Sequence, residues 1–168
     1  MPTGLLIPRK YFVVKGKGLS KASPLMAFDN ALRDAGISAL NLVPVSSILP
    51  PDIEEEEPHQ LPRGAIVFLV MSEKRAKGPA RISAGISWAR GRPYGYVIEI
   101  HDEESAHGSH GMLRKMWDEI NSRREFELEE PRYMVEELWI PEGYYGSVVA
   151  ALVFSEVELV PSRGDKPQ

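Results

Sequence analysis

Hydrophobic and polar residues alternate along several short stretches of this 168-residue chain, and each such stretch predicts a β-strand. The first, KYFVVKG, is rich in β-branched and aromatic residues and predicts a strand over about 10–14, ended by the glycines at 16 and 18. Further strands are expected at about 39–46, 64–72, 81–89 and 94–101, and in the closing segments RYMVEELWI and GSVVAALVFSEVELV.

The segment SPLMAFDNALRDAG predicts a helix with signals at both ends. Ser23 can cap the first turn, Pro24 suits the first helical position, and Gly36 suits the left-handed residue after the end. The buried face is expected to hold the large apolar residues that share one side of the helix, Leu25, Phe28 and Leu32.

A second helix is expected over about 105–123, where apolar residues recur at helical spacing, at Met112, Met116, Trp117 and Ile120. Many strands with two helices, in an order without regular βαβ alternation, indicate an α+β fold with mixed or mostly antiparallel sheets. No internal repeat or long linker divides the chain, so residues 1–168 are expected to form a single domain.

Composition and charge exclude several classes of protein. The formal net charge is -4 with acidic and basic residues interspersed, so no nucleic-acid partner is expected. The absence of cysteine excludes disulfides, thiolate zinc sites and cysteine nucleophiles. No apolar run is long enough for a signal peptide or a membrane span, so a cytoplasmic protein without a membrane partner is expected.

Two polar segments raise the question of a metal site. The acidic stretch PPDIEEEEPHQLP, residues 50–62, is bracketed by prolines, and we expect a solvated loop because its four consecutive glutamates repel one another. The run HDEESAHGSH contains His101, His107 and His110 but lacks the i, i+4 pair that places two imidazoles on one helical face. We expect a loop and a helix cap without a metal there, and a metal-dependent hydrolase stays open as an alternative.

The stretch NLVPVSSILPP, residues 41–51, places two adjacent serines between prolines, with no turn glycine and no helix to cap. The prolines restrict the backbone on both sides, so Ser46 and Ser47 are expected to be rigid and partly dry. A serine hydroxyl held in this way can attack the carbonyl of the preceding residue, and elimination from the resulting ester cuts the chain. The new amino end is a dehydroalanine, which hydrolyses to a pyruvoyl group with loss of ammonia. Backbone strain at this peptide would assist the reaction.

The chain resembles the pyruvoyl-dependent arginine decarboxylases of archaea and some bacteria. The resemblance is carried by NLVPVSSILPP, PLMAFDNALRDAGI, LPRGAIV, SAGISWA and YGYVIEI, which together run from about residue 7 to residue 100. It implies a proenzyme that cuts itself between Ser46 and Ser47. The products would be a β chain, residues 1–46, and an α chain, residues 47–168, whose first residue is a pyruvoyl cofactor made from Ser47.

The resemblance also implies roles for single residues. Glu99, in YGYVIEI, matches the catalytic glutamate of the family, and its apolar neighbours are expected to bury it and favour the protonated acid that donates to the substrate. Strand alternation leaves open that Glu99 faces water instead. Asn41 matches an asparagine linked to the processing step, where its amide can donate to an oxyanion. The alternative for Asn41 is an amide that bonds the backbone at a strand edge.

Asp29, in AFDNAL, matches the aspartate that contacts the substrate in this family. A carboxylate pairs bidentately with a guanidinium, which suits arginine as substrate. The alternative is an ordinary surface pair with Arg33, four residues further along the helix. Ser38 departs from the glycine that often follows AGI in the family, and this puts backbone contacts to the substrate in doubt.

Assembly and activity also follow from the resemblance. It implies a four-layer αββα sandwich that forms a homotrimer or hexamer, with active sites between neighbouring protomers. The expected reaction converts L-arginine to agmatine and carbon dioxide, in polyamine biosynthesis or acid resistance. Two alternatives stay open, the same chemistry on another amino acid and an uncleaved, non-catalytic binding or assembly domain.

Overall fold

The computed structural model describes residues 4–102, 106–123 and 125–162. Strands predominate and two helices accompany them, so the expected α+β class is confirmed. In chain order the elements are β1 (Gly4–Ser20), α1 (Pro24–Ala35), β2 (Asn41–Pro44), β3 (Ile48–Leu49), β4 (Glu54–Glu55), β5 (Ile66–Lys77), β6 (Ala80–Ala89), β7 (Gly91–Arg92), β8 (Gly95–Asp102), α2 (Ala106–Asn121), β9 (Glu127–Leu128), β10 (Arg132–Ile140) and β11 (Tyr145–Pro161). The two-residue strands β3, β4, β7 and β9 were not predicted.

Most strands belong to two sheets. The five-stranded sheet has the order β2-β5-β11-β1-β4, and the four-stranded sheet has the order β10-β6-β8-β3. Strands β7 and β9 pair separately. The pairs β1 with β4 and β2 with β5 are parallel, and the other pairs are antiparallel. The sheets are therefore mixed and mostly antiparallel, as expected.

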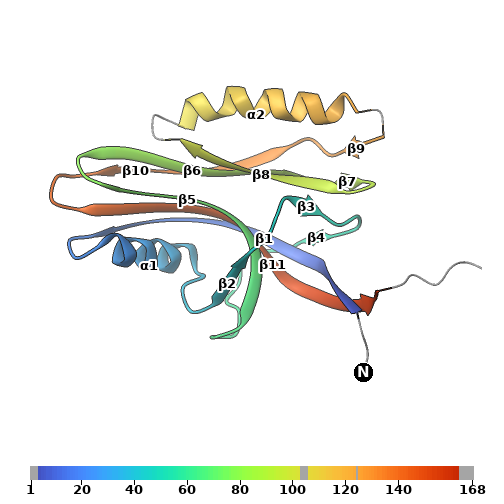
Figure 1. The fold of residues 1–168 in the computed structure, drawn as a ribbon, viewed down its shortest axis with the longest axis horizontal. Coiled ribbons are helices and arrows are strands. Elements are labelled where there is room, and N and C mark those ends of the chain that lie inside the picture. The colour runs from blue at the N-terminus through green and yellow to red at the C-terminus, as the bar shows by residue number, and fades with distance from the viewer. Residues whose placement is uncertain (1–3, 103–105, 124, 163–168) are drawn as a thin grey trace, which may run out of the picture.

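The two helices cover opposite sides of the molecule (Figure 1). Helix α1 contacts β1, β5 and β11 of the five-stranded sheet, and α2 contacts β6, β8 and β10 of the four-stranded sheet. The two sheets face each other across a core of buried side chains from both, which include Tyr11, Val70, Ile86, Val97 and Leu152. A residue on α1 is thus separated from a residue on α2 by both sheets.

Strand β1 extends well beyond the predicted 10–14, and the glycines at 16 and 18 do not end it. Both glycines lie under α1. A Cβ atom at Gly16 would come within 2.3 Å of the Ala31 carbonyl oxygen, and one at Gly18 within 2.5 Å of the Ala27 carbonyl oxygen. Glycine permits this close approach of two backbones. These residues therefore serve helix packing, and the predicted strand end was wrong.

The signals that predicted α1 are confirmed, whereas its predicted buried face is partly wrong. The Ser23 hydroxyl accepts a hydrogen bond from the Met26 N–H at 3.1 Å, and Gly36 has φ 80° after the last turn. Leu25 is 66% exposed. Because the helix lies on the two glycines, mainly its small side chains face the sheet, and the buried residues are Ala27, Ala31, Leu32 and Ala35.

None of the helices among the described residues combines the length and the apolar character needed to cross a membrane.

Candidate active site

The serine pair lies where the chain crosses from one sheet to the other. Before the pair, the Val45 N–H donates to the Leu69 carbonyl oxygen of β5 at 2.8 Å. After it, the Ser47 carbonyl oxygen accepts a hydrogen bond from the Val97 N–H of β8, also at 2.8 Å. The peptide between Ser46 and Ser47 is thus tied to a different sheet on each side. This arrangement restrains the pair through hydrogen bonds that no local sequence pattern indicates.

The solvent exposure of the pair differs from the expectation. Ser46 is exposed and Ser47 is half-buried, so only the second serine is partly dry. Among the described residues other than glycine, Asp52 alone has a positive φ, 66°. The serine pair therefore shows no left-handed backbone strain.

Ser47 and Glu99 open onto the same pocket, which has a volume of about 610 Å³. Ser47 reaches it from the crossing segment, and Glu99 reaches it from β8. Its described lining consists of Ser47, Tyr96, Val97, Ile98, Glu99, Met116, Glu119, Ile120 and Arg123. Two residues 52 positions apart in the sequence, selected by family motifs, are therefore brought together by the fold.

Glu99 is exposed, so the expectation that its apolar neighbours bury it was wrong. The reason lies in the edge of the four-stranded sheet. Strand β3 pairs only with Tyr96 and Gly95 of β8, and the rest of β8 has no strand beyond it on that side among the described residues. Glu99 thus lies at a free sheet edge beside the pocket. Its exposure agrees with the alternative that strand alternation left open, in which Glu99 faces water.

Asp29 and Asn41 do not line this pocket. Asp29 lies on α1, which packs on the five-stranded sheet, and pairs with Arg33 at 3.0 Å, which is the surface pair that its helical spacing allowed. The Asn41 side-chain amide donates to the Gly64 carbonyl oxygen at 2.9 Å, as expected of a strand-edge amide. Within one chain, Ser47 and Glu99 share a site and Asp29 is separate from it.

Helix α2 supplies pocket residues that the sequence reading did not select, namely Glu119 and Arg123, with Met116. These residues recur at positions i, i+3 and i+7, and such spacing places them on one helical side. Met116 was one of the apolar residues whose spacing predicted the helix, and it is 41% exposed. Helical spacing could have grouped these side chains, but it could not show that the group faces Ser47.

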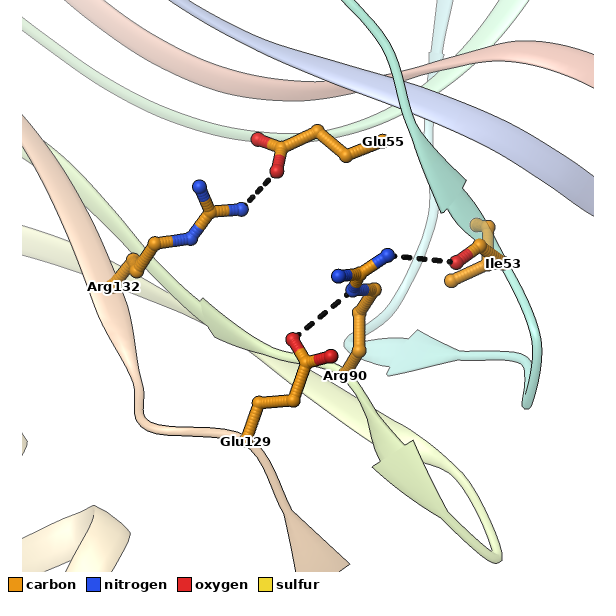
Figure 2. Close-up of polar contacts among 5 residues, drawn as sticks. All are labelled: Ile53, Glu55, Arg90, Glu129 and Arg132. Carbon is orange, nitrogen blue, oxygen red and sulfur yellow. Dashed lines mark hydrogen bonds and ion pairs between the residues drawn. The ribbon is translucent and has the colours of Figure 1, made fainter.

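The acidic stretch after the serines is tied to the four-stranded sheet (Figure 2). Glu55 forms an ion pair with Arg132 at the start of β10. Arg90 pairs with Glu129 at 3.1 Å and also donates to the Ile53 carbonyl oxygen at 3.5 Å. Glu54, Glu55 and Glu57 are exposed, as expected of a solvated stretch. The expected irregular loop was wrong in part, because the stretch includes β4 and contacts arginines that are distant in sequence.

A second polar group holds the end of the same stretch. The Glu56 carboxylate accepts hydrogen bonds from the Ser155 hydroxyl and from His59 Nε2, and both bonds lower the pKa of Glu56. The hydrogen bond to Glu56 raises the pKa of His59. The His59 ring also packs edge-on against Phe12, with 5.5 Å between ring centroids. The loop is thus joined to β1 and β11.

The three histidines of the run belong to two elements. The backbone of His101 belongs to β8 and that of His107 and His110 to α2, but their side chains lie outside the described part of the structure. Among the residues described, no three histidine or carboxylate side chains are grouped so as to hold a metal ion.

A family model described as pyruvoyl-dependent arginine decarboxylase matches residues 10–159. The chain is also similar to curated proteins of that name. The pyruvoyl-dependent arginine decarboxylase 1 of Methanosarcina acetivorans is 36% identical over 165 residues, which cover 89% of this chain and 96% of the relative. The protein of Methanopyrus kandleri is 35% identical over 149 residues, 88% of this chain and 97% of the relative.

A third relative matches a shorter part of the chain. The pyruvoyl-dependent arginine decarboxylase of Methanococcoides burtonii is 44% identical over 113 residues, which cover 60% of this chain and 62% of that relative.

Proposed function

This chain belongs to the family of pyruvoyl-dependent arginine decarboxylases, and we propose that it converts L-arginine to agmatine and carbon dioxide after cutting itself between Ser46 and Ser47. The observation that carries the proposal is the shared pocket of Ser47 and Glu99. The proposed reaction requires these two residues to act on the same substrate, because Ser47 is the origin of the cofactor and Glu99 is the proton donor.

The proposed self-cleavage uses the restrained serine pair. The Ser47 hydroxyl attacks the carbonyl carbon of Ser46, and the ester that forms is then broken by elimination. The hydrogen bonds from Val45 and to Ser47 hold the reacting peptide on both sides, which reduces the entropy cost of reaching the reactive geometry. In the described conformation the Asn41 amide donates to Gly64, so its proposed part in processing requires exchange of this bond for one to the reacting oxygen.

The residues around position 47 fit a pyruvoyl group. When present, this group supplies the electron sink for the loss of carbon dioxide. The carbonyl oxygen of residue 47 is already held by the Val97 N–H at 2.8 Å, which fixes the orientation of the chain end that would carry the group. The pocket leaves about 610 Å³ beside it for a substrate. Glu99 opens onto this space and is the proposed proton donor to the substrate α carbon.

We further propose that the molecule is a four-layer αββα sandwich that assembles as a trimer, with Asp29 of a neighbouring copy completing each site. In one chain Asp29 lies on α1, which packs on the five-stranded sheet, whereas Glu99 lies on β8 of the four-stranded sheet, so a single copy does not bring these two carboxylates to one substrate. Apolar side chains are exposed along the crossing segment and the adjacent strand, where a neighbour would cover them: Val43 at 37%, Val45 at 36%, Ile48 at 46% and Ile66 at 69%.

Intact mass under denaturing conditions tests the proposal directly. The wild-type chain should give two fragments, residues 1–46 and residues 47–168, and the larger should be lighter by one ammonia than hydrolysis would leave it. Ser47→Ala should remain one chain without decarboxylase activity, because both the attacking oxygen and the cofactor carbon skeleton come from Ser47. Borohydride should inactivate the cleaved enzyme, and reduction with labelled arginine should attach the label to the larger fragment.

Ser155→Ala is the matched control, since it removes a serine hydroxyl on β11 that bonds Glu56, and it should cleave as the wild type does. A wild-type protein that stays whole yet decarboxylates arginine would defeat the pyruvoyl mechanism. A protein that stays whole and inactive would favour the non-catalytic binding domain. Cleavage with activity on lysine or ornithine, and none on arginine, would keep the mechanism and change the substrate.

A further inference from the structure

Arg123 contributes the one guanidinium among the described residues that line the active-site pocket. The same lining holds two carboxylates, Glu99 and Glu119. A free basic amino acid carries the opposite set of charges, two cationic groups and one carboxylate. Arg123 is the group in this lining whose charge matches the substrate carboxylate.

The position of Arg123 is set by the turn that follows α2. Its backbone N–H donates to the Ile120 carbonyl oxygen at 3.1 Å, and its carbonyl oxygen accepts from the Phe126 N–H at 3.2 Å. The Phe126 ring packs against Tyr94 and Tyr96 of the neighbouring hairpin, with centroid distances of 5.0 and 5.6 Å. The turn is thus anchored to β8, which limits the positions that the guanidinium can reach.

The guanidinium points toward the end of β8 that lies next to Ser47. Arg123 Nη1 is 3.4 Å from the Tyr96 hydroxyl, a long hydrogen bond. Tyr96 pairs across the sheet with Ile48, the residue directly after Ser47. No carboxylate among the described residues forms an ion pair with Arg123, and its side chain is exposed at the pocket. It therefore retains its capacity to bind an anionic group.

We propose that Arg123 binds the α-carboxylate of the amino-acid substrate as it enters the pocket. This inference rests on the proposed function, because it assumes an amino acid whose α-amino group reaches residue 47. A guanidinium binds a carboxylate through two parallel hydrogen bonds, which orients the substrate as well as attracting it. The α-amino group lies one carbon away from that carboxylate and is thereby directed toward residue 47.

The contact between Arg123 and the substrate carboxylate is expected to assist substrate binding more than the decarboxylation step. The carboxylate loses its charge as carbon dioxide leaves, so an arginine that stayed paired with it would stabilise the substrate more than the transition state. Arg123 is exposed and can release the group as the reaction proceeds. Its removal should therefore appear mainly in KM for arginine, with a smaller effect on kcat.

The test compares arginine with agmatine, which carries the same guanidinium but has no carboxylate. In cleaved enzyme, Arg123→Gln should raise KM for arginine by about tenfold. This is the effect expected from losing a charge-assisted hydrogen bond whose strength is reduced by solvent exposure. The inhibition constant of agmatine should stay as in the wild type. Arg123→Lys keeps the charge and should recover much of the loss. Arg114→Gln is the matched control, an exposed arginine of α2 that lines a different pocket.

Each outcome decides the inference. An equal change for arginine and agmatine would mean a general structural effect and would overturn it, as would an unchanged KM in an active Arg123→Gln variant. If Arg123→Gln does not fold, Arg123→Lys carries the test, and equal losses for the two ligands in that variant would count against the inference. A wild-type chain that neither cleaves nor acts on arginine would instead defeat the proposed function on which the inference rests.

Discussion

The carboxyl group of Glu99 stands at the free edge of β8, beside the pocket that also contains Ser47. Glu99→Gln keeps the shape of the side chain but removes the carboxyl proton that Glu99 is proposed to donate. We expect turnover on arginine to fall by about a hundredfold or more while self-cleavage persists, since general acid catalysis contributes on this order. Steady-state kinetics and intact mass, measured on the same sample, check both expectations.

Glu142→Gln, in the turn between β10 and β11, is a control with the same loss of charge away from the pocket. It should leave turnover unchanged. Agmatine production by Glu99→Gln at the rate of the wild type would transfer the role of proton donor to another group.

The hydrogen-bonded pair of Glu56 and His59 predicts a pH-dependent contribution to stability. Because the pKa of His59 is raised in the folded chain, this histidine stabilises the fold below its unfolded pKa and the contribution is lost as pH rises through the folded value. The lowered pKa of Glu56 acts in the other direction, stabilising above the unfolded pKa of the carboxyl and failing as pH falls through the folded value.

Melting temperatures of the wild type and of His59→Ala should therefore differ most at pH values where the Glu56 carboxyl is ionised and His59 is protonated in the folded chain. We expect the variant to be less stable at about pH 5.5 and the difference to shrink by about pH 9, where the histidine is neutral in both states. Glu56→Gln should remove most of this pH dependence. A difference of equal size at both pH values would show that His59 acts through its ring contact with Phe12 alone.

At the scale of the elements, α1 and β1 depend on the absence of side chains at two positions. Gly16→Ala would place a Cβ atom within 2.3 Å of the Ala31 carbonyl oxygen, so the helix would have to move away from the strand. Alanine restricts the unfolded chain, which raises the free energy of unfolding by up to about 1 kcal/mol. Overpacking against the helix backbone costs more, so we expect the free energy of unfolding to fall by about 2 kcal/mol in all. Denaturant unfolding measures it.

Gly85→Ala provides the comparison within the four-stranded sheet. Its added Cβ would meet the side-chain ends of Val135 at 3.1 Å and Ile100 at 3.4 Å, which can shift by rotation. We expect a smaller loss of stability than for Gly16→Ala. Equal losses for the two variants would contradict the view that backbone contact with α1 sets the requirement at position 16.

At the scale of the whole molecule, Asp29 and Glu99 lie apart within one chain, since α1 packs on the five-stranded sheet and β8 belongs to the four-stranded sheet. If each site takes Asp29 from a neighbouring copy, co-expressed Asp29→Asn and Glu99→Gln chains should regain activity that neither variant has alone. In a random equal mixture about one site in four contains both intact residues, so about a quarter of the wild-type activity is expected.

The same variants expressed separately and mixed without subunit exchange should stay inactive, which serves as the control. Co-expressed chains with no gain in activity would remove Asp29 from any shared site. Asp29→Asn with unchanged kinetics on arginine would remove it from substrate binding altogether.

Local and motif-based features of this protein were readable from the sequence alone. The cap at Ser23 and the left-handed Gly36 involve neighbouring residues, so the pattern at each end of α1 was sufficient to predict the helix. The serine pair and Glu99 were selected through motifs of a family to which the chain belongs. The strand and helix order followed from hydrophobic periodicity, because each periodicity is set by the backbone of one segment.

The surroundings of these residues were decided only by tertiary structure. Pairing of β3 with β8 brings residue 47 beside residue 97, and α2 then adds Glu119 and Arg123 to the same pocket. Glu99 is exposed because β3 ends before reaching it. Such contacts join segments tens of residues apart, and their geometry depends on how sheets and helices pack together. No local pattern of residues encodes that packing, which is why Ser47 and Glu99 were found and the pocket residues Glu119 and Arg123 were not.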